Sequence, residues 1–162
     1  MYLLDANAFM EASRLYYASD IAPGFWTWLG DPTHEGQVAS IEAVRDEITA
    51  GTDNLVTWAL ARPDAFWLTD TDEAVAAMRL LAGWATDPAR QYRQQAVDEF
   101  LDSADLKLIA HAMALEATVV TREQPAPESK KKIKIPDVCK DFNVVWTDPF
   151  SLYRTLGMRL IT

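Results

Sequence analysis

Cysteine and histidine are scarce in this sequence of 162 residues, and their scarcity excludes several kinds of site. The single cysteine, Cys139, cannot form an internal disulfide. Together with only two histidines, His34 and His111, it can build neither a zinc finger nor the two-histidine motif of a zinc protease. A metal bound by this chain would therefore be a hard cation held by carboxylate oxygens.

Basic residues and long apolar stretches are also lacking. The formal net charge of -9 argues against broad, charge-driven adhesion to nucleic acid or to an anionic membrane, because such binding needs a basic surface. No apolar run approaches the roughly 18 residues that a membrane-spanning helix needs. The opening residues have no basic start and already include Asp5, which is atypical of a signal peptide. We therefore expect a cytoplasmic protein with no membrane partner.

Short apolar segments alternate with helical patterns along the chain. This alternation predicts a parallel sheet covered by helices on both faces, which is a three-layer α/β domain. The length suits one domain with a sizeable core, so we expect a single domain over residues 1–162. Ser40 and Ser103 are expected to cap the helices that follow them, and residues 122–136 read as a long loop. The expected strands are "YLL" (2–4), "QVAS" (37–40), "AFWL" (65–68), "TVVT" (118–121) and "NVVW" (143–146).

The helix expected over residues 104–116 carries an acid on its apolar face. On a helical wheel Asp105 falls near the middle of an apolar arc, so its carboxylate points inward. The alternative is that Asp105 lies in the first helical turn, where the helix dipole favours acids. His111 falls on the opposite, polar face, and we assign it no chemistry. The apolar arc consists of Leu108, Ile109, Ala112 and Met113.

Three further acids stand at related places in the predicted fold. Asp5 and Glu123 follow strands, and the carboxyl ends of parallel strands are where sites form in open α/β sheets. Glu47 lies at the edge of the apolar stripe of the helix after the second strand. Taken singly, each residue has an ordinary structural alternative: Asp5 as a helix cap, Glu123 as a loop acid and Glu47 as a solvated residue. Taken together with Asp105, they are predicted to converge on one rim of the sheet.

Such a cluster of acids needs cations. Two like charges about 4 Å apart at an effective dielectric of about 20 repel by roughly 4 kcal/mol, so the acids would protonate or separate without compensation. Mg²⁺ or Mn²⁺ supplies the compensation, because both ions prefer oxygen ligands. Two such ions about 4 Å apart can activate water and stabilise the leaving oxygen of a phosphodiester.

With these residues in place, the chain resembles the PIN-domain ribonucleases. The family pattern has an acid after the first strand with Thr, Ser or Asn two residues later, a helical Glu, an Asp in an "sADxxLxAxA" helix, and a last acid after "lvT". These motifs fall on "LLDANAF", "VRDEI", "SADLKLIAHA" and "VVTRE" in this sequence. Over the whole chain the sequence is similar to a bacterial PIN-like family of unassigned function, related to the VapC-like toxins.

The resemblance implies a sheet of four or five parallel strands and a Mg²⁺- or Mn²⁺-dependent endoribonuclease. It also implies a toxin of a type II toxin–antitoxin pair, whose partners would be RNA and a cognate antitoxin protein; the oligomer to consider is a homodimer. The metal ligands and catalytic residues would be Asp5, Glu47, Asp105 and Glu123, with Asn7 and Thr121 in support.

The long loop contains a lysine cluster that ordinary PIN toxins do not have. These lysines are predicted to grip RNA phosphates beside the acids, and the alternative is a solvated loop. The cluster consists of Lys130, Lys131, Lys132 and Lys134.

Two other functions compete with the nuclease. One is a phosphohydrolase of the haloacid-dehalogenase type, with Asp5 as nucleophile, Thr121 as its second motif and Lys130 as charge stabiliser. That family has a second Asp two residues after the nucleophile, whereas this chain has Asn7. The other is a PIN-like binding module whose acids are idle.

Overall fold

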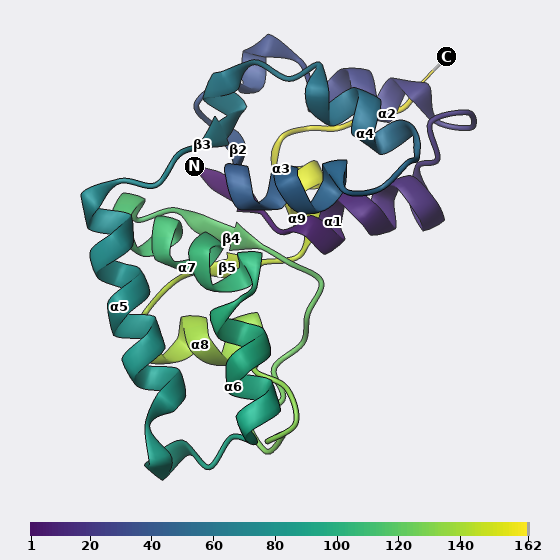
Figure 1. Ribbon diagram of the computed structural model, residues 1–162. Coiled ribbons are helices and arrows are strands. Elements are labelled where there is room, and N and C mark those ends of the chain that lie inside the picture. Colours follow the sequence, from purple (N-terminus) through teal and green to yellow (C-terminus); the bar gives the residue numbers. More distant parts are fainter. Residues whose placement is uncertain (162) are drawn as a thin grey trace.

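The computed structural model describes residues 1–161, in which a five-stranded sheet has the order β3-β2-β1-β4-β5 (Figure 1). Every pair of neighbouring strands in this part of the chain is parallel. The predicted α/β class with a parallel sheet is therefore confirmed, and the arrangement is consistent with a three-layer PIN-like fold. The strands are β1 (Tyr2–Leu4), β2 (Val38–Ile41), β3 (Trp67–Leu68), β4 (Thr118–Val120) and β5 (Trp146–Thr147).

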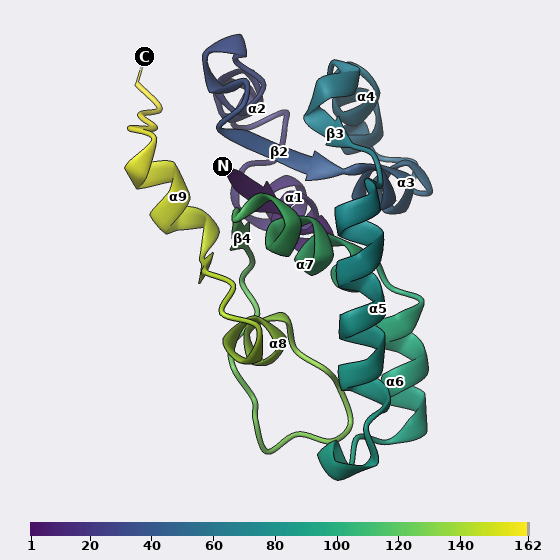
Figure 2. The same cartoon turned by 90° about the vertical axis from the view of Figure 1, so that its left-hand side faces the viewer.

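Helices connect the strands and flank the sheet. Figure 1 shows α2 and α4 at one end of the molecule and α5 and α6 at the other, and Figure 2 shows α5 beside α6 from a second side. Short helical turns are η1 (Ala12–Tyr16), η2 (Pro32–His34), η3 (Asp64–Phe66) and η4 (Pro88–Arg90). The α-helices are α1 (Ala6–Glu11), α2 (Pro23–Leu29), α3 (Glu42–Thr49), α4 (Asn54–Leu60), α5 (Asp72–Thr86), α6 (Gln94–Leu101), α7 (Ala104–Leu115), α8 (Ile135–Asp141) and α9 (Pro149–Thr155).

The strand order creates one reversal point in the sheet. From β1 the chain moves outward to β2 and β3, and it then returns to the other side of β1 with β4 and β5. Ligand sites in open α/β sheets form at the carboxyl ends of the strands where the order reverses, which here is the end of β1 and β4. Leu4 of β1 lies opposite Val120 of β4, so the residues that follow them emerge side by side.

Helix α7 lies at the centre of the structure. It contacts β2 and β4 and packs against α3, α5 and α6. The helix therefore buries residues on most of its circumference, including His111 with 2% exposure. The placement of His111 on a polar face was wrong, because α5 covers the side of α7 that a helical wheel assigns to solvent. Instead, His111 Nε2 lies 3.0 Å from the Asp70 carboxylate.

Two serines that were expected to cap helices differ in their outcome. Ser103 caps α7 as predicted, because its hydroxyl accepts a hydrogen bond from the Leu106 N–H. Ser40 is not a cap: it is buried within β2, and its hydroxyl donates to the Leu4 carbonyl at 2.6 Å. The helix after β2 starts one residue later than expected, with Ile41 in the capping position.

The segment expected to be a long loop also contains helical structure. Helix α8 begins at Ile135, inside the range 122–136, and Pro136 lies in its first turn, where a missing backbone N–H costs nothing. Its other inward residues, Val138 and Cys139, are fully buried. In the described part of the chain, no helix has the length and apolar character needed to cross a bilayer.

The Ser40 hydrogen bond links β2 to the end of β1, next to Asp5. Ser40→Ala removes a buried donor from the Leu4 carbonyl and is expected to lower the free energy of unfolding by about 1 to 2 kcal/mol. Urea denaturation measures this loss. Thr52→Ala, at an exposed position, is the control and should change stability little. Equal stability of the two variants would contradict a structural role for this hydrogen bond.

Candidate functional site

Asp5 is buried at the reversal point of the sheet. Its backbone N–H donates to the Val120 carbonyl at 3.0 Å, which continues the pairing of β1 with β4 by one residue. Its Oδ1 accepts a hydrogen bond from the Ala8 N–H at 2.6 Å and caps α1. The side chain is only 1% exposed. Asp5 is thus both the helix cap and the strand-end acid that the sequence offered as alternatives.

Thr121 lies beside Asp5 at the end of β4. Its N–H donates to the Thr147 carbonyl of β5 at 2.9 Å, and its side chain hydrogen-bonds the Asp5 carboxylate. The Thr121 Oγ1 also accepts a hydrogen bond from the Glu123 N–H at 3.0 Å. The predicted supporting role of Thr121 therefore has a geometric basis, because it orients both Asp5 and the chain that carries Glu123.

The surroundings of Asp5 disfavour its charge. Burial raises the pKa of its carboxyl from 3.8 to about 7. Hydrogen bonds from Thr121 and Ala8 act in the opposite direction, whereas the charges of Asp105 and Glu123 raise the pKa further. Asp5 is therefore coupled electrostatically to both of these acids, although they are about a hundred residues or more away in sequence.

Asp105 is the second acid with a raised pKa. It lies in the first turn of α7, directly after the cap at Ser103. Burial is the main cause that raises its pKa from 3.8 to about 6, and the charges of Glu123 and Glu47 add to it. The structure thus places Asp105 close enough to Asp5, Glu47 and Glu123 for their charges to interact.

A cleft of about 680 Å³ joins the remaining candidates. Glu47 enters it from α3, and Asn7 enters it from α1; both side chains are exposed. Asp105 also lines this cleft, and Ala6, the neighbour of Asp5, forms part of its wall. Two lysines, Lys107 and Lys132, also border this cleft.

Glu123 has both carboxylate oxygens engaged. Oε2 accepts a hydrogen bond from the Ile135 N–H at 2.8 Å, and Oε1 lies 3.6 Å from the Lys132 ammonium. The side chain is 9% exposed. Glu123 therefore links the end of β4 to the start of α8 as well as facing the acidic cluster.

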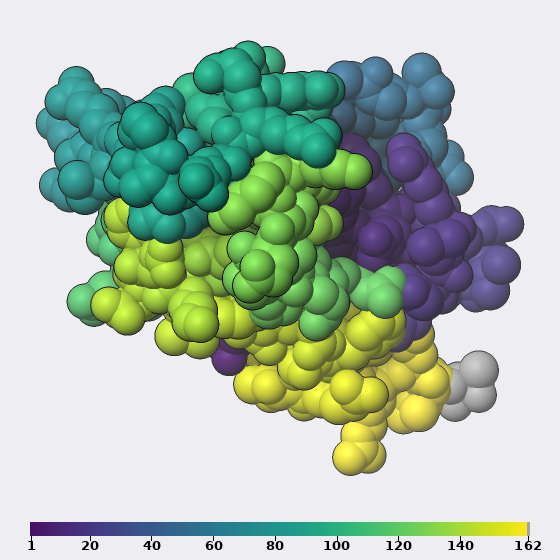
Figure 3. All heavy atoms as spheres, turned by 90° about the horizontal axis from the view of Figure 1, so that it is seen from below, coloured from purple at the N-terminus to yellow at the C-terminus, as the bar shows by residue number. Residues whose placement is uncertain are grey.

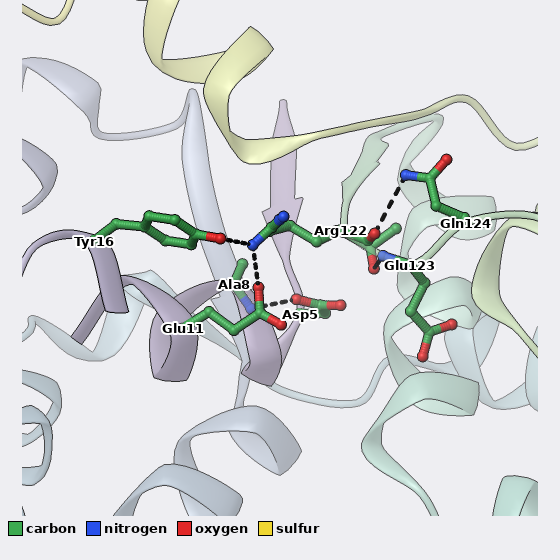
Figure 4. Close-up of polar contacts among 8 residues, drawn as sticks. Asp5, Ala8, Glu11, Tyr16, Arg122, Glu123 and Gln124 are labelled. Atoms are coloured by element: carbon green, nitrogen blue, oxygen red, sulfur yellow. Dashed lines mark hydrogen bonds and ion pairs between the residues drawn. The ribbon is translucent and has the colours of Figure 1, made fainter. Parts of the chain in front are cut away.

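Arg122 is a structural residue that the sequence analysis missed. Figure 4 shows its side chain extending towards Glu11 and Tyr16, while the next residue, Glu123, points the other way. The guanidinium lies 3.1 Å from Glu11 Oε2, hydrogen-bonds the Tyr16 hydroxyl and lies over the rings of Tyr16 and Phe150. These contacts fasten the segment after β4 to α1, η1 and α9. No sequence pattern signals them, because the partners lie far apart along the chain.

The four candidate lysines do not act as one group. Lys132 borders the cleft, and the charges of Lys132 and Lys134 lower the pKa of Asp105 against the acids that raise it. Lys130 instead lies 5.2 Å from the centre of the Tyr92 ring, and its backbone carbonyl accepts a hydrogen bond from the Arg93 N–H. Lys131 is exposed. Only two of the predicted RNA-binding lysines, Lys132 and Lys134, therefore act on Asp105 through their charge.

A second polar cluster, also missed in the sequence, lies at the end of β3. Asp70 accepts from His111 at 3.0 Å and from Lys107 at 3.3 Å. Partial burial would raise the pKa of Asp70, but these two partners outweigh it and hold the pKa below its ordinary value. The cluster anchors Lys107 beside the cleft.

The donor chemistry of the site suits a hydrated Mg²⁺ or Mn²⁺ ion. No group of three or more His, Cys, Asp or Glu side chains in residues 1–161 is placed to hold a metal ion. Mg²⁺ commonly binds through only one or two carboxylates and keeps several waters, so it does not need a closed protein cage. The mutual repulsion of Asp5, Asp105 and Glu123 is the observation that fits a cation here.

Comparison with known proteins places the chain in a family. The family model described as "Domain of unknown function (DUF4411)" matches residues 2–160. The chain belongs to the DUF4411 family. No curated protein matches it at a significant level.

The acids of this DUF4411 protein make its stability depend on pH. Because folding raises the pKa of Asp5 and Asp105, the folded protein holds more protons than the unfolded chain between about pH 4 and pH 7. The contribution of these two acids to stability is therefore full below pH 4 and is lost as the pH rises. Asp105→Asn should reduce the loss between pH 5 and pH 8 by on the order of 1 to 2 kcal/mol.

Urea denaturation in the presence of EDTA measures this effect. Acids that are not coupled to Asp105 titrate equally in both proteins and cancel in the difference. Asp5 loses the repulsion of the Asp105 charge in the variant, which reduces the loss of stability in the same direction. Asp98→Asn, an exposed position on α6, is the control and should follow the wild type. Parallel pH profiles for wild type and Asp105→Asn would show that Asp105 has an ordinary pKa.

Proposed function

We propose that this protein is a divalent-metal-dependent endoribonuclease. The observation that supports this proposal most is the convergence of Asp5, Asp105 and Glu123, from three separate segments, on the reversal point of a parallel sheet. Glu47 lines the same cleft as Asp105, and its charge acts on Asp105. The pKa values of Asp5 and Asp105 are raised, which lowers stability at neutral pH, and carboxyls perturbed in this way are typical of functional sites.

The fixed residues of the site are suited to positioning. Asp5 is held by the Ala8 N–H and by Thr121, so its carboxylate has one orientation. Asp105 stands in the first turn of α7, directly after the Ser103 cap, which fixes the position of its backbone. We assign these two as the principal ligands of the ion. The bound ion would supply a hydroxide from its water and would neutralise the charge of the scissile phosphate.

The exposed residues of the cleft are suited to binding substrate. Glu47 lines the cleft with Asp105 and can accept a proton from water or contribute to the ion's shell. Asn7 can donate its amide N–H groups to a phosphate oxygen. Lys107 and Lys132 border the same opening and supply local positive charge, which an RNA backbone needs on a protein with a net charge of -9.

The geometry favours the nuclease over the phosphohydrolase. The phosphohydrolase needs Lys130 beside Asp5, but Lys130 lies on the Tyr92 ring and lines a different hollow with Asp87 and Asp141. The choice of RNA as substrate, and the role as toxin with a cognate antitoxin, follow from the resemblance to PIN-domain ribonucleases and stay predictions. A binding module with idle acids is the outcome that the next experiment would reveal.

Asp105→Asn is expected to reduce RNA cleavage in Mn²⁺ by at least a hundredfold, because a neutral amide is a much weaker ligand for a hard cation than a carboxylate. The assay incubates labelled total RNA with wild type and variant, each with Mn²⁺ and then with EDTA. Asp98→Asn is the control and should cleave like the wild type.

The cleavage assay has two results that would refute the assignment. Cleavage by the wild type that persists in EDTA would remove the metal from the mechanism. Equal cleavage by Asp105→Asn and wild type would remove Asp105 from the site. Absence of cleavage by every protein, with a tight protein partner, would favour the binding module.

A further inference from the structure

Lys132 has an unusual place in the acidic cleft. Its ammonium lies 3.6 Å from Glu123 Oε1, and the residue lines two adjoining hollows, both of which Asp105 also lines. The Glu123 side chain is nearly buried, whereas that of Lys132 is 52% exposed. The lysine therefore reaches from solvent towards a buried acid, with its charge at the inner end.

The backbone around Lys132 is held on both sides. Before it, the Lys130 carbonyl accepts the Arg93 N–H at 2.9 Å. After it, Ile133 is buried with 3% exposure, and the Ile135 N–H donates to Glu123 at 2.8 Å. Seen from below in Figure 3, this light-green stretch lies between the teal region of α5 and α6 and the purple N-terminal region. The segment from Lys130 to Ile135 is thus held at both ends, and this positions Lys132 beside the cleft.

The position of Lys132 lets its positive charge offset the repulsion among the acids. The cluster gathers four carboxylates, and the charges of Lys132 and Lys134 are the ones that act on Asp105 against this repulsion. A second divalent ion would sit near Glu123, where the ammonium of Lys132 already lies. An ammonium and a divalent ion repel each other, so both cannot be held closely by the same carboxylate.

We propose that Lys132 is the resident cation of the acidic cleft and competes with a divalent ion for Glu123. Glu123 is then a partner of Lys132, and divalent ions are held chiefly on the side of Asp5 and Asp105. This inference deepens the proposed function, because it concerns the ions of the same site. It also predicts that Lys132 weakens ion binding while stabilising the ion-free protein.

Calorimetric titration with Mn²⁺ tests the competition. Lys132→Met removes the charge but keeps the length of the aliphatic chain, and it is expected to bind Mn²⁺ about tenfold more tightly than the wild type or to bind an additional ion. Lys131→Met loses the same net charge at the neighbouring exposed position, and its Mn²⁺ affinity should stay within twofold of the wild type. Lys132→Arg keeps the charge and should also resemble the wild type.

Thermal unfolding in EDTA provides a second readout. Without an ion, Lys132→Met leaves the acids less compensated and should unfold at a lower temperature than Lys131→Met. Circular dichroism checks that each variant is folded, and Lys132→Gln takes the place of Lys132→Met if the latter does not fold.

The outcomes separate this inference from the proposed function. Tighter Mn²⁺ binding by Lys132→Met alone supports the competition. Equal or weaker binding by Lys132→Met than by wild type overturns it and leaves the nuclease proposal standing. Binding by Lys132→Met but not by the wild type supports the competition and overturns a metal-dependent wild-type enzyme. Binding by neither protein overturns both.

Discussion

The burial of one carboxylate, that of Asp5, is the constraint on which the site depends. It is placed at the end of the central strand by pairing of its own backbone with Val120, and it is fixed by the Ala8 N–H. Removing a carboxylate from water is costly, and here the cost shows as a pKa raised to about 7. The neighbouring acids increase this cost, so the fold carries an electrostatic strain at one defined point.

The remaining architecture serves to hold other groups near that point. The return of the chain from β3 to β4 places Thr121 and Glu123 beside Asp5, and α7 brings Asp105 from the far side. Arg122 then fastens the segment after β4 to the first helix. These long-range links explain why residues that are separated by a hundred positions respond to each other's charge.

Local sequence signals located the five strands but not all of their bounds. The expected strand 143–146 shares only Trp146 with β5, and the expected strand 65–68 begins inside the turn η3. Apolar runs of β-branched and leucine residues marked the buried strands, and strand ends marked Asp5 and Glu123. The inward direction of Asp105 followed from helical spacing alone. Each of these features depends on residues close together in the chain, which a single sequence displays.

Features set by tertiary packing were not predictable in this way. His111 is buried because α5 covers it, and Ser40 bonds to Leu4 because β1 lies beside β2. Lys130 and Lys132 have different surroundings because the segment that carries them passes Tyr92 at one position and Glu123 at the other. A lysine cluster in a sequence gives the total charge but not the direction of each side chain. It therefore predicted a single RNA-binding group, whereas the structure places these lysines in two different environments.

We propose that Asp5, directly after β1, and Asp105, in the first turn of α7, hold a divalent ion. Anomalous diffraction from crystals grown with Mn²⁺ tests it most directly, because the signal locates the ion independently of any activity. We expect a peak between the carboxylates of Asp5 and Asp105, within reach of Glu47. Mn²⁺ bound at full occupancy elsewhere on the protein, with no peak at Asp5 and Asp105, would contradict this assignment.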